Sequence, residues 1–183
     1  GRRYIRTSAE ELVNDIVYQI GAIREFGRRH GVRLQHVKPH GALYMEAAAN
    51  EQLSELLVHT LARTCGDSAL FCMGISKTYE IARQAGYPVI REFYADRDYD
   101  RSGSIVFARQ VARPKPEEVA AKCVRACKEG LVRTIDGKDI EIEFESICFH
   151  SDTPGALDMG KAIRAGLTEA GIKIAPASTM LGL

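Results

Sequence analysis

A lysine and a histidine lie on a short loop directly after an apolar segment of this chain. The segment, residues 32–37, is typical of a buried strand, and Lys38 and His40 follow it at once. Pro39 ends the strand because it has no backbone N–H and keeps the preceding residue extended, and Gly41 allows a sharp turn. Enzymes of the α/β class carry their chemistry at such strand ends, so we expect both side chains in a functional site.

Polar side chains also lie at or just after the ends of two later apolar segments, residues 88–93 and 146–150. The carboxyl ends of parallel strands lie on one face of a barrel, where residues from different strands converge. A histidine beside carboxylates is suited to proton transfer, and a cation beside them to binding an anionic group. The residues concerned are Glu92, Asp96, Arg97, His150, Ser151 and Asp152.

Most of these residues also have an interpretation that involves no chemistry. His40 is suited to capping a turn, and Asp152 to stabilising a helix N-terminus through the helix dipole. Asp96 and Arg97 are suited to a local ion pair on a solvated loop, worth under about 1 kcal/mol. Glu92 is harder to explain in this way, because a charge at the end of an apolar strand costs free energy unless it is partnered.

Helices and strands alternate along the chain and must position these residues. The first helix is predicted from a capping box of Ser8 and Glu11 to Gly31, and its apolar stripe consists of Leu12, Ile16, Ile20 and Ile23. Further helices are predicted over residues 50–64, 76–86, 116–129 and 154–170. Strands are predicted over residues 32–37, 69–73, 88–93, 146–150 and 172–175, with a brief extended piece at 104–109.

A β-hairpin is predicted around Asp136-Gly137, between residues 132–135 and the alternating apolar and acidic run 140–145. The other strands alternate with helices of ten or so residues, a pattern that favours βα units. We therefore expect an α/β fold with a parallel sheet or barrel, as a single domain over residues 1–183.

Composition excludes several functional classes. The net charge is +1 and the basic residues are scattered, so nothing predicts a nucleic-acid-binding surface. No apolar run is long enough for a membrane span or a signal peptide. The sequence has no phosphate-binding loop of the Walker or dinucleotide type, so a nucleotide would need another binding surface.

The five cysteines indicate free thiols, because their number is odd and no C-x-x-C pair occurs. This usage predicts a cytoplasmic protein. Cys123 and Cys127 are four residues apart on the apolar face of a helix, which favours core packing, and we predict no zinc site built from cysteines.

Three strings in this chain resemble the LamB/YcsF family, and they occur in the family's order. They are KPHGALY at residues 38–44, EFYADRDY at 92–99 and SICFHSDTP at 146–154. The resemblance covers nearly the whole chain. It implies the A subunit of the bacterial ATP-dependent 5-oxoprolinase, which opens 5-oxo-L-proline to L-glutamate together with subunits B and C.

The resemblance also implies a seven-stranded (β/α) barrel of the glycoside hydrolase/deacetylase type, related to the sugar and polysaccharide deacetylases. The chain opens on the family's Gly-Arg-Arg string, so we expect the barrel's N-terminal strands to be absent from these residues. That segment would carry the polar groups most like the deacetylases' metal-binding positions. An incomplete barrel exposes strand edges and predicts pairing with another chain, including a second copy of itself.

The lactam chemistry suggests roles for the residues. Phosphorylation of the lactam oxygen by ATP would turn it into a leaving group that water can displace. Lys38 or Arg97 would bind carboxylate or phosphate charge, while His40 with Glu92 or Asp96 transfers protons. Asp152 would orient His150 or water. The predicted substrate-binding residues are Lys38, Arg97, Arg3, Tyr44 and Ser151; ATP is expected on a partner subunit.

Two departures from the family and two rival functions remain. Ser151 stands where the family usually has glycine, and Met45 where it often has asparagine. A side chain at Ser151 would either obstruct a substrate or place a hydroxyl in the pocket.

The first rival function is that of an ATP-independent amide hydrolase that uses a divalent metal. The second is a non-catalytic binding or regulatory piece, recognised by partner binding without turnover.

Overall fold

The computed structural model describes residues 3–106 and 112–181. The chain divides into two compact units, Gly1–Arg91 with Pro176–Leu183, and Glu92–Ala175. Strand β3 (Val89–Tyr94) is shared, because the division falls after Arg91. The single barrel domain over residues 1–183 stays a prediction.

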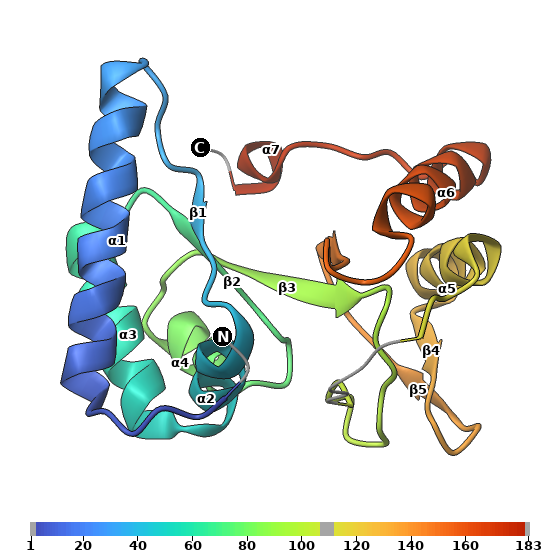
Figure 1. Cartoon of the computed structure of the whole chain (residues 1–183), viewed down its shortest axis with the longest axis horizontal. Helices are drawn as coiled ribbons and strands as arrows, with labels where there is room; N and C mark the ends of the chain where they lie inside the picture. Colours follow the sequence, from blue (N-terminus) through green and yellow to red (C-terminus); the bar gives the residue numbers. More distant parts are fainter. Residues whose placement is uncertain (1–2, 107–111, 182–183) are drawn as a thin grey trace. The chain divides into compact units, whose positions relative to one another are not determined.

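The first unit combines a short parallel sheet with helices (Figure 1). Its strands are β1 (His36–Val37), β2 (Ala69–Cys72) and the first half of β3, and they pair in the order β1-β2-β3. Its helices are α1 (Ala9–Arg29), α2 (Gly41–Ala49), α3 (Glu51–Thr64), α4 (Lys77–Gln84) and α7 (Ala177–Leu181). Helix α3 packs against α1 and α4, and its residues Leu57, Val58 and Leu61 are completely buried.

The second unit carries an antiparallel hairpin, one parallel strand pair and two long helices that pack side by side (Figure 1). The hairpin joins β4 (Leu131–Arg133) to β5 (Asp139–Glu141), and β6 (Ser146–Cys148) lies parallel to the second half of β3. The helices are α5 (Pro116–Glu129) and α6 (Ala156–Glu169). The observed pairs confirm an α/β fold with parallel strands.

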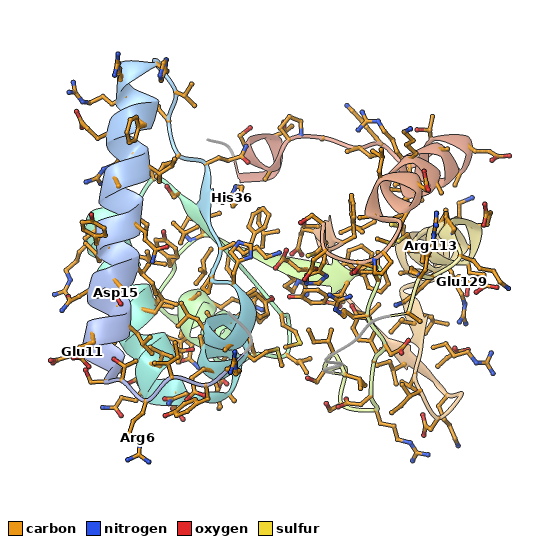
Figure 2. The ribbon with its side chains drawn as sticks, viewed as in Figure 1. Arg6, Glu11, Asp15, His36, Arg113 and Glu129 are labelled. Carbon is orange, nitrogen blue, oxygen red and sulfur yellow. The ribbon has the colours of Figure 1, made fainter. Side chains whose placement is uncertain are left out.

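Helix α1 begins at the predicted capping box. The backbone N–H of Glu11 donates to the Ser8 hydroxyl (3.2 Å), and the Glu11 carboxylate accepts from the Ser8 backbone (2.9 Å). Figure 2 shows Glu11 in the first turn of the helix. Ile16 and Ile20 are buried as predicted, but Ile23 is exposed. The reason is that α3 ends near this level, where the carbonyl oxygen of Thr64 accepts from Arg24 (2.8 Å).

Two predicted strands are wrong in extent for one shared reason. The strand predicted at 32–37 is only His36–Val37, and residues 172–175 form no strand. Val32 and Ile172 are used instead to end α1 and α6, because their N–H groups bond back to Gly27 and Leu167 (both 2.9 Å). This closure requires a left-handed residue just before each, which is Gly31 or Gly171.

Other boundaries differ at glycines and at an alanine-rich run. The loop predicted at 38–44 is shorter, because α2 begins at Gly41 and runs through alanines of high helix propensity. Helix α6 begins at Ala156 rather than Pro154, because Gly155 before it has a left-handed φ of 81°. In the piece predicted at 104–109, Ile105 bridges to Tyr99, and residues 107–109 lie outside the described part.

All five cysteines are free thiols, as predicted. Cys123 is completely buried, which confirms the core-packing interpretation for that residue. Among the described residues, no helix has both the length and the apolar character needed to cross a membrane.

Candidate active site

Strand register brings two of the predicted segments together in the second unit. The last matched pair of β3 and β6 is Tyr94 with Cys148, and Asp96 and His150 each lie two residues further along. The backbone N–H of Ala95 donates to the carbonyl oxygen of Cys148 (2.9 Å), which extends the ladder toward them. The two side chains therefore meet at the carboxyl ends of neighbouring parallel strands.

Asp96 holds the imidazole ring of His150. The ring's Nδ1 lies 2.9 Å from Oδ1 and 3.2 Å from Oδ2 of Asp96, and the His150 backbone N–H donates to Oδ2 (3.2 Å). An ionised carboxylate only accepts hydrogen bonds, so Nδ1 carries the proton and Nε2 is the acceptor in the neutral ring. The His150 side chain is 33% exposed, so solvent or a reactant can reach the ring.

Thr153 and Arg97 complete the surroundings of Asp96. The Thr153 hydroxyl donates to Oδ2 (2.5 Å), and Nη1 of Arg97 donates to Oδ2 (2.8 Å) and to the Thr153 hydroxyl (3.1 Å). The Asp96 side chain is 0% exposed and that of Arg97 is 9%. The ion pair proposed as an alternative exists, but the interpretation as a solvated loop is wrong. Thr153 was missed, although it lies in the third family string.

These contacts set the charge of Asp96. Burial alone would raise the pKa of the carboxyl group. Hydrogen bonds from His150 and Thr153, together with the charges of His150 and Arg97, outweigh burial and lower the pKa to about 2. Asp96 is therefore a fixed anion at neutral pH, suited to orienting the histidine and to stabilising it when it is protonated.

The lowered pKa predicts a loss of stability in acid. A carboxyl group with a lower pKa in the folded state stabilises the protein above its unfolded pKa, and loses this effect as pH falls through the folded pKa. The pKa of Asp96 is lowered from the ordinary 3.8 to about 2. We therefore expect the free energy of unfolding to fall by about 2 kcal/mol between about pH 4 and about pH 2.

Urea unfolding at both pH values measures this loss. The variant Asp96→Asn lacks the titrating group, so its free energy of unfolding should change less over the same interval, by about the same 2 kcal/mol. Equal changes in the two proteins would contradict the assignment of the acid effect to Asp96.

Glu92 is buried and partnered, as its position in an apolar strand required. It is 4% exposed, and the Tyr94 hydroxyl donates to its Oε2 (3.4 Å). The Tyr94 ring is stacked near the ring of His150, with centroids 6.4 Å apart. Glu92 is thus linked to His150 through Tyr94, which the sequence analysis did not single out.

Ser151 and Asp152 lie in the turn between β6 and α6, and both are exposed. The helix begins after Gly155, so Asp152 is not its N-cap residue. An orienting contact to His150, which we predicted for Asp152, is made by Asp96; the orienting role of Asp152 stays a prediction. A role for Ser151 or Asp152 toward substrate stays a prediction.

The remaining predicted site residues belong to the first unit. Lys38 is half-buried after β1, and Arg3 is exposed. His40 is exposed and is the N-cap residue of α2, but its side chain makes no capping hydrogen bond. Tyr44 is 8% exposed and lines a small hollow with Pro39. Binding or catalytic roles for these four residues stay predictions.

Within residues 3–106 and 112–181, no three His, Cys, Asp or Glu side chains come together in a way that could hold a metal ion. Four protein groups donate hydrogen bonds to the buried carboxylate of Asp96, two on His150 and one each on Arg97 and Thr153. These contacts account for its buried charge.

This geometry would suit general acid–base catalysis. Asp96 fixes the ring and the tautomer of His150, and Nε2 is left to accept or return a proton at a reacting group. The arrangement depends on two loops that follow neighbouring strands, each held by buried hydrogen bonds.

Comparison with known proteins finds relatives over nearly the whole chain. The LamB/YcsF family matches residues 1–182. The chain is 58% identical to a 5-oxoprolinase A subunit of Pseudomonas aeruginosa over 174 residues, 95% of this chain and 69% of that protein. It is 38% identical to the 5-oxoprolinase A subunit of Pyrococcus abyssi over 189 residues, 100% of this chain and 72% of that protein.

A solved structure agrees with these relatives. The lactam utilization protein from Thermus thermophilus matches with a TM-score of 0.87 at 32% identity, over 95% of this chain and 70% of that one. Sequence and fold thus point the same way, and the chain belongs to the LamB/YcsF family.

Proposed function

We propose that this chain is the A subunit of an ATP-dependent 5-oxoprolinase, which opens the lactam of 5-oxo-L-proline to L-glutamate together with subunits B and C. The observation that carries the proposal is the 58% identity, over 95% of the chain, to a protein named as a 5-oxoprolinase A subunit. The Asp96–His150 pair supports it, because lactam opening requires proton transfer to a leaving nitrogen.

The reaction explains why an acid–base pair is needed. The lactam is a resonance-stabilised amide, so transfer of the γ-phosphoryl group of ATP to its oxygen activates the ring carbon and releases ADP. Water adds to that carbon, the C–N bond breaks, and the nitrogen takes a proton. A second water hydrolyses the resulting acyl phosphate to glutamate and phosphate. In this scheme His150 accepts a proton from water at Nε2 and returns it to the ring nitrogen.

The anionic groups of the reaction need cations. Lys38 and Arg97 are the proposed partners of the substrate carboxylate or of the developing phosphate charge, and Arg97 already uses Nη1 on Asp96. Glu92 and His40 remain the other proposed proton carriers. Arg3, Tyr44, Ser151 and Asp152 remain proposed contacts to substrate or water.

ATP is proposed to bind on a partner subunit, because this sequence contains no phosphate-binding loop. We further propose that the two units belong to one seven-stranded (β/α) barrel, and that the protein is cytoplasmic, which the five free thiols favour.

The test is an assay of the full-length protein with and without subunits B and C. We expect 5-oxoproline-dependent release of glutamate and ADP only when all three subunits and ATP are present. Glutamate formation without ATP or partners, abolished by a chelator, would instead establish the metal-dependent hydrolase. Binding to partners whose turnover is the same with or without this chain would establish a non-catalytic role.

A further inference from the structure

A lysine that the sequence analysis did not single out reaches the loop after β3 from helix α5. The ammonium group of Lys122 donates to the backbone carbonyl oxygens of Tyr94 (3.3 Å), Ala95 (3.2 Å) and Arg97 (2.5 Å). These residues flank Asp96 on both sides. A single side chain therefore binds the backbone immediately before and after the carboxylate of the candidate active site.

The surroundings of Lys122 are costly for a charge unless it is partnered. Its Nζ lies over the rings of Phe93 (5.3 Å) and Tyr99 (5.1 Å). Burial lowers the pKa of Lys122, and the nearby charge of Asp98 opposes that change. The three carbonyl oxygens and two aromatic faces are what compensate the ammonium group for the water it has lost.

Other groups hold further atoms of the same loop backbone. The N–H of Tyr94 donates to the Tyr99 hydroxyl (2.6 Å), and the carbonyl oxygen of Asp96 accepts from Arg97 (3.0 Å). The N–H of Ala95 is paired to Cys148, and Lys122 adds three carbonyl groups to this set of fixed atoms. Without Lys122, these carbonyl oxygens would each lose a hydrogen-bond donor. Unpaired backbone groups cost free energy, so we expect the loop to rearrange.

We propose that Lys122 is a positioning residue for the Asp96–His150 pair, because its ammonium group fixes the backbone of the loop that presents Asp96 to the ring. A compact ammonium with three donors suits three carbonyl oxygens, whereas the planar guanidinium of arginine matches them only in part. The consequence for turnover rests on the proposed function, but the consequence for the Asp96–His150 hydrogen bond does not.

The experiment compares Lys122→Met, Lys122→Arg and the matched control Lys128→Met, an exposed lysine on the same helix. In the full-length protein with its partner subunits, we expect Lys122→Met to lower kcat by about 100-fold, the effect of a displacement near 1 Å. KM should change less than about threefold, because the loss falls on the chemical step. Lys122→Arg should restore part of kcat, and Lys128→Met should match the unsubstituted protein.

A second readout is independent of activity. The low-field proton NMR signal of the His150 Nδ1–H is assigned by its absence in His150→Asn, and should be shifted or lost in Lys122→Met but retained in Lys128→Met. If Lys122→Met does not fold, two other variants test the same loop. Tyr99→Phe removes the hydroxyl that accepts from the Tyr94 backbone, and Lys122→Arg retains the charge. The NMR signal should then be displaced in both variants, and by more in Tyr99→Phe.

The outcomes separate the two proposals. An unchanged NMR signal and unchanged kcat in the folded Lys122 variants overturn the positioning role. If His150→Asn leaves turnover unchanged while Lys122→Met still alters the signal, the function proposed for the site fails and the positioning role stands.

Discussion

Replacing His150 with asparagine is expected to lower kcat of the assembled enzyme by about 100- to 10,000-fold, the contribution typical of a general acid–base group. The asparagine amide can still donate to Asp96 from near the place of Nδ1, so the buried Asp96–Arg97 ion pair keeps its surroundings. The variant lacks Nε2, the atom that would carry the proton. Steady-state kinetics with saturating ATP and 5-oxoproline measures the loss.

The control is His59→Asn, which makes the same chemical change at an exposed position on α3. Its kcat should equal that of the unsubstituted protein, and the thermal unfolding midpoints of both variants should stay within a few degrees of it, as expected for changes of about 0.5 kcal/mol. A folded His150→Asn enzyme with normal kcat would remove His150 from the mechanism.

Replacing Phe93 with alanine is expected to lower the free energy of unfolding by about 3–5 kcal/mol. The ring is completely buried and stacks between Tyr99 (centroids 5.5 Å apart) and Phe144 (4.9 Å). It also lies beneath the ammonium group of Lys122. Truncation leaves a cavity and removes aromatic contacts beneath the loop that carries Asp96, and few compensating movements are available in a packed core. Urea unfolding gives the value.

Phe26→Ala is the matched control, because Phe26 is 61% exposed on α1. The same truncation there should change the free energy of unfolding by less than about 0.5 kcal/mol. If the two substitutions had similar costs, the packing of Phe93 between its aromatic neighbours would not be a main source of stability.

Local chemistry made much of the fold predictable. Ser8 with Glu11 marked the start of α1, and Pro116 marked the start of α5, because such signals involve residues only a few positions apart. The same kind of signal misled where a glycine was followed by an apolar residue. Val32 and Ile172 look like strand residues in the sequence, yet their N–H groups close helices.

The sequence by itself determined the alternation of helices and strands, the free thiols and, through three strings, the family. It also placed Asp96 just after one predicted strand and His150 at the end of another. Only the tertiary structure decided that Asp96 holds His150, and that Thr153 and Lys122 hold Asp96 and its loop. These contacts join residues 25 to 57 positions apart. They depend on strand register and helix packing, which no local pattern of residues encodes.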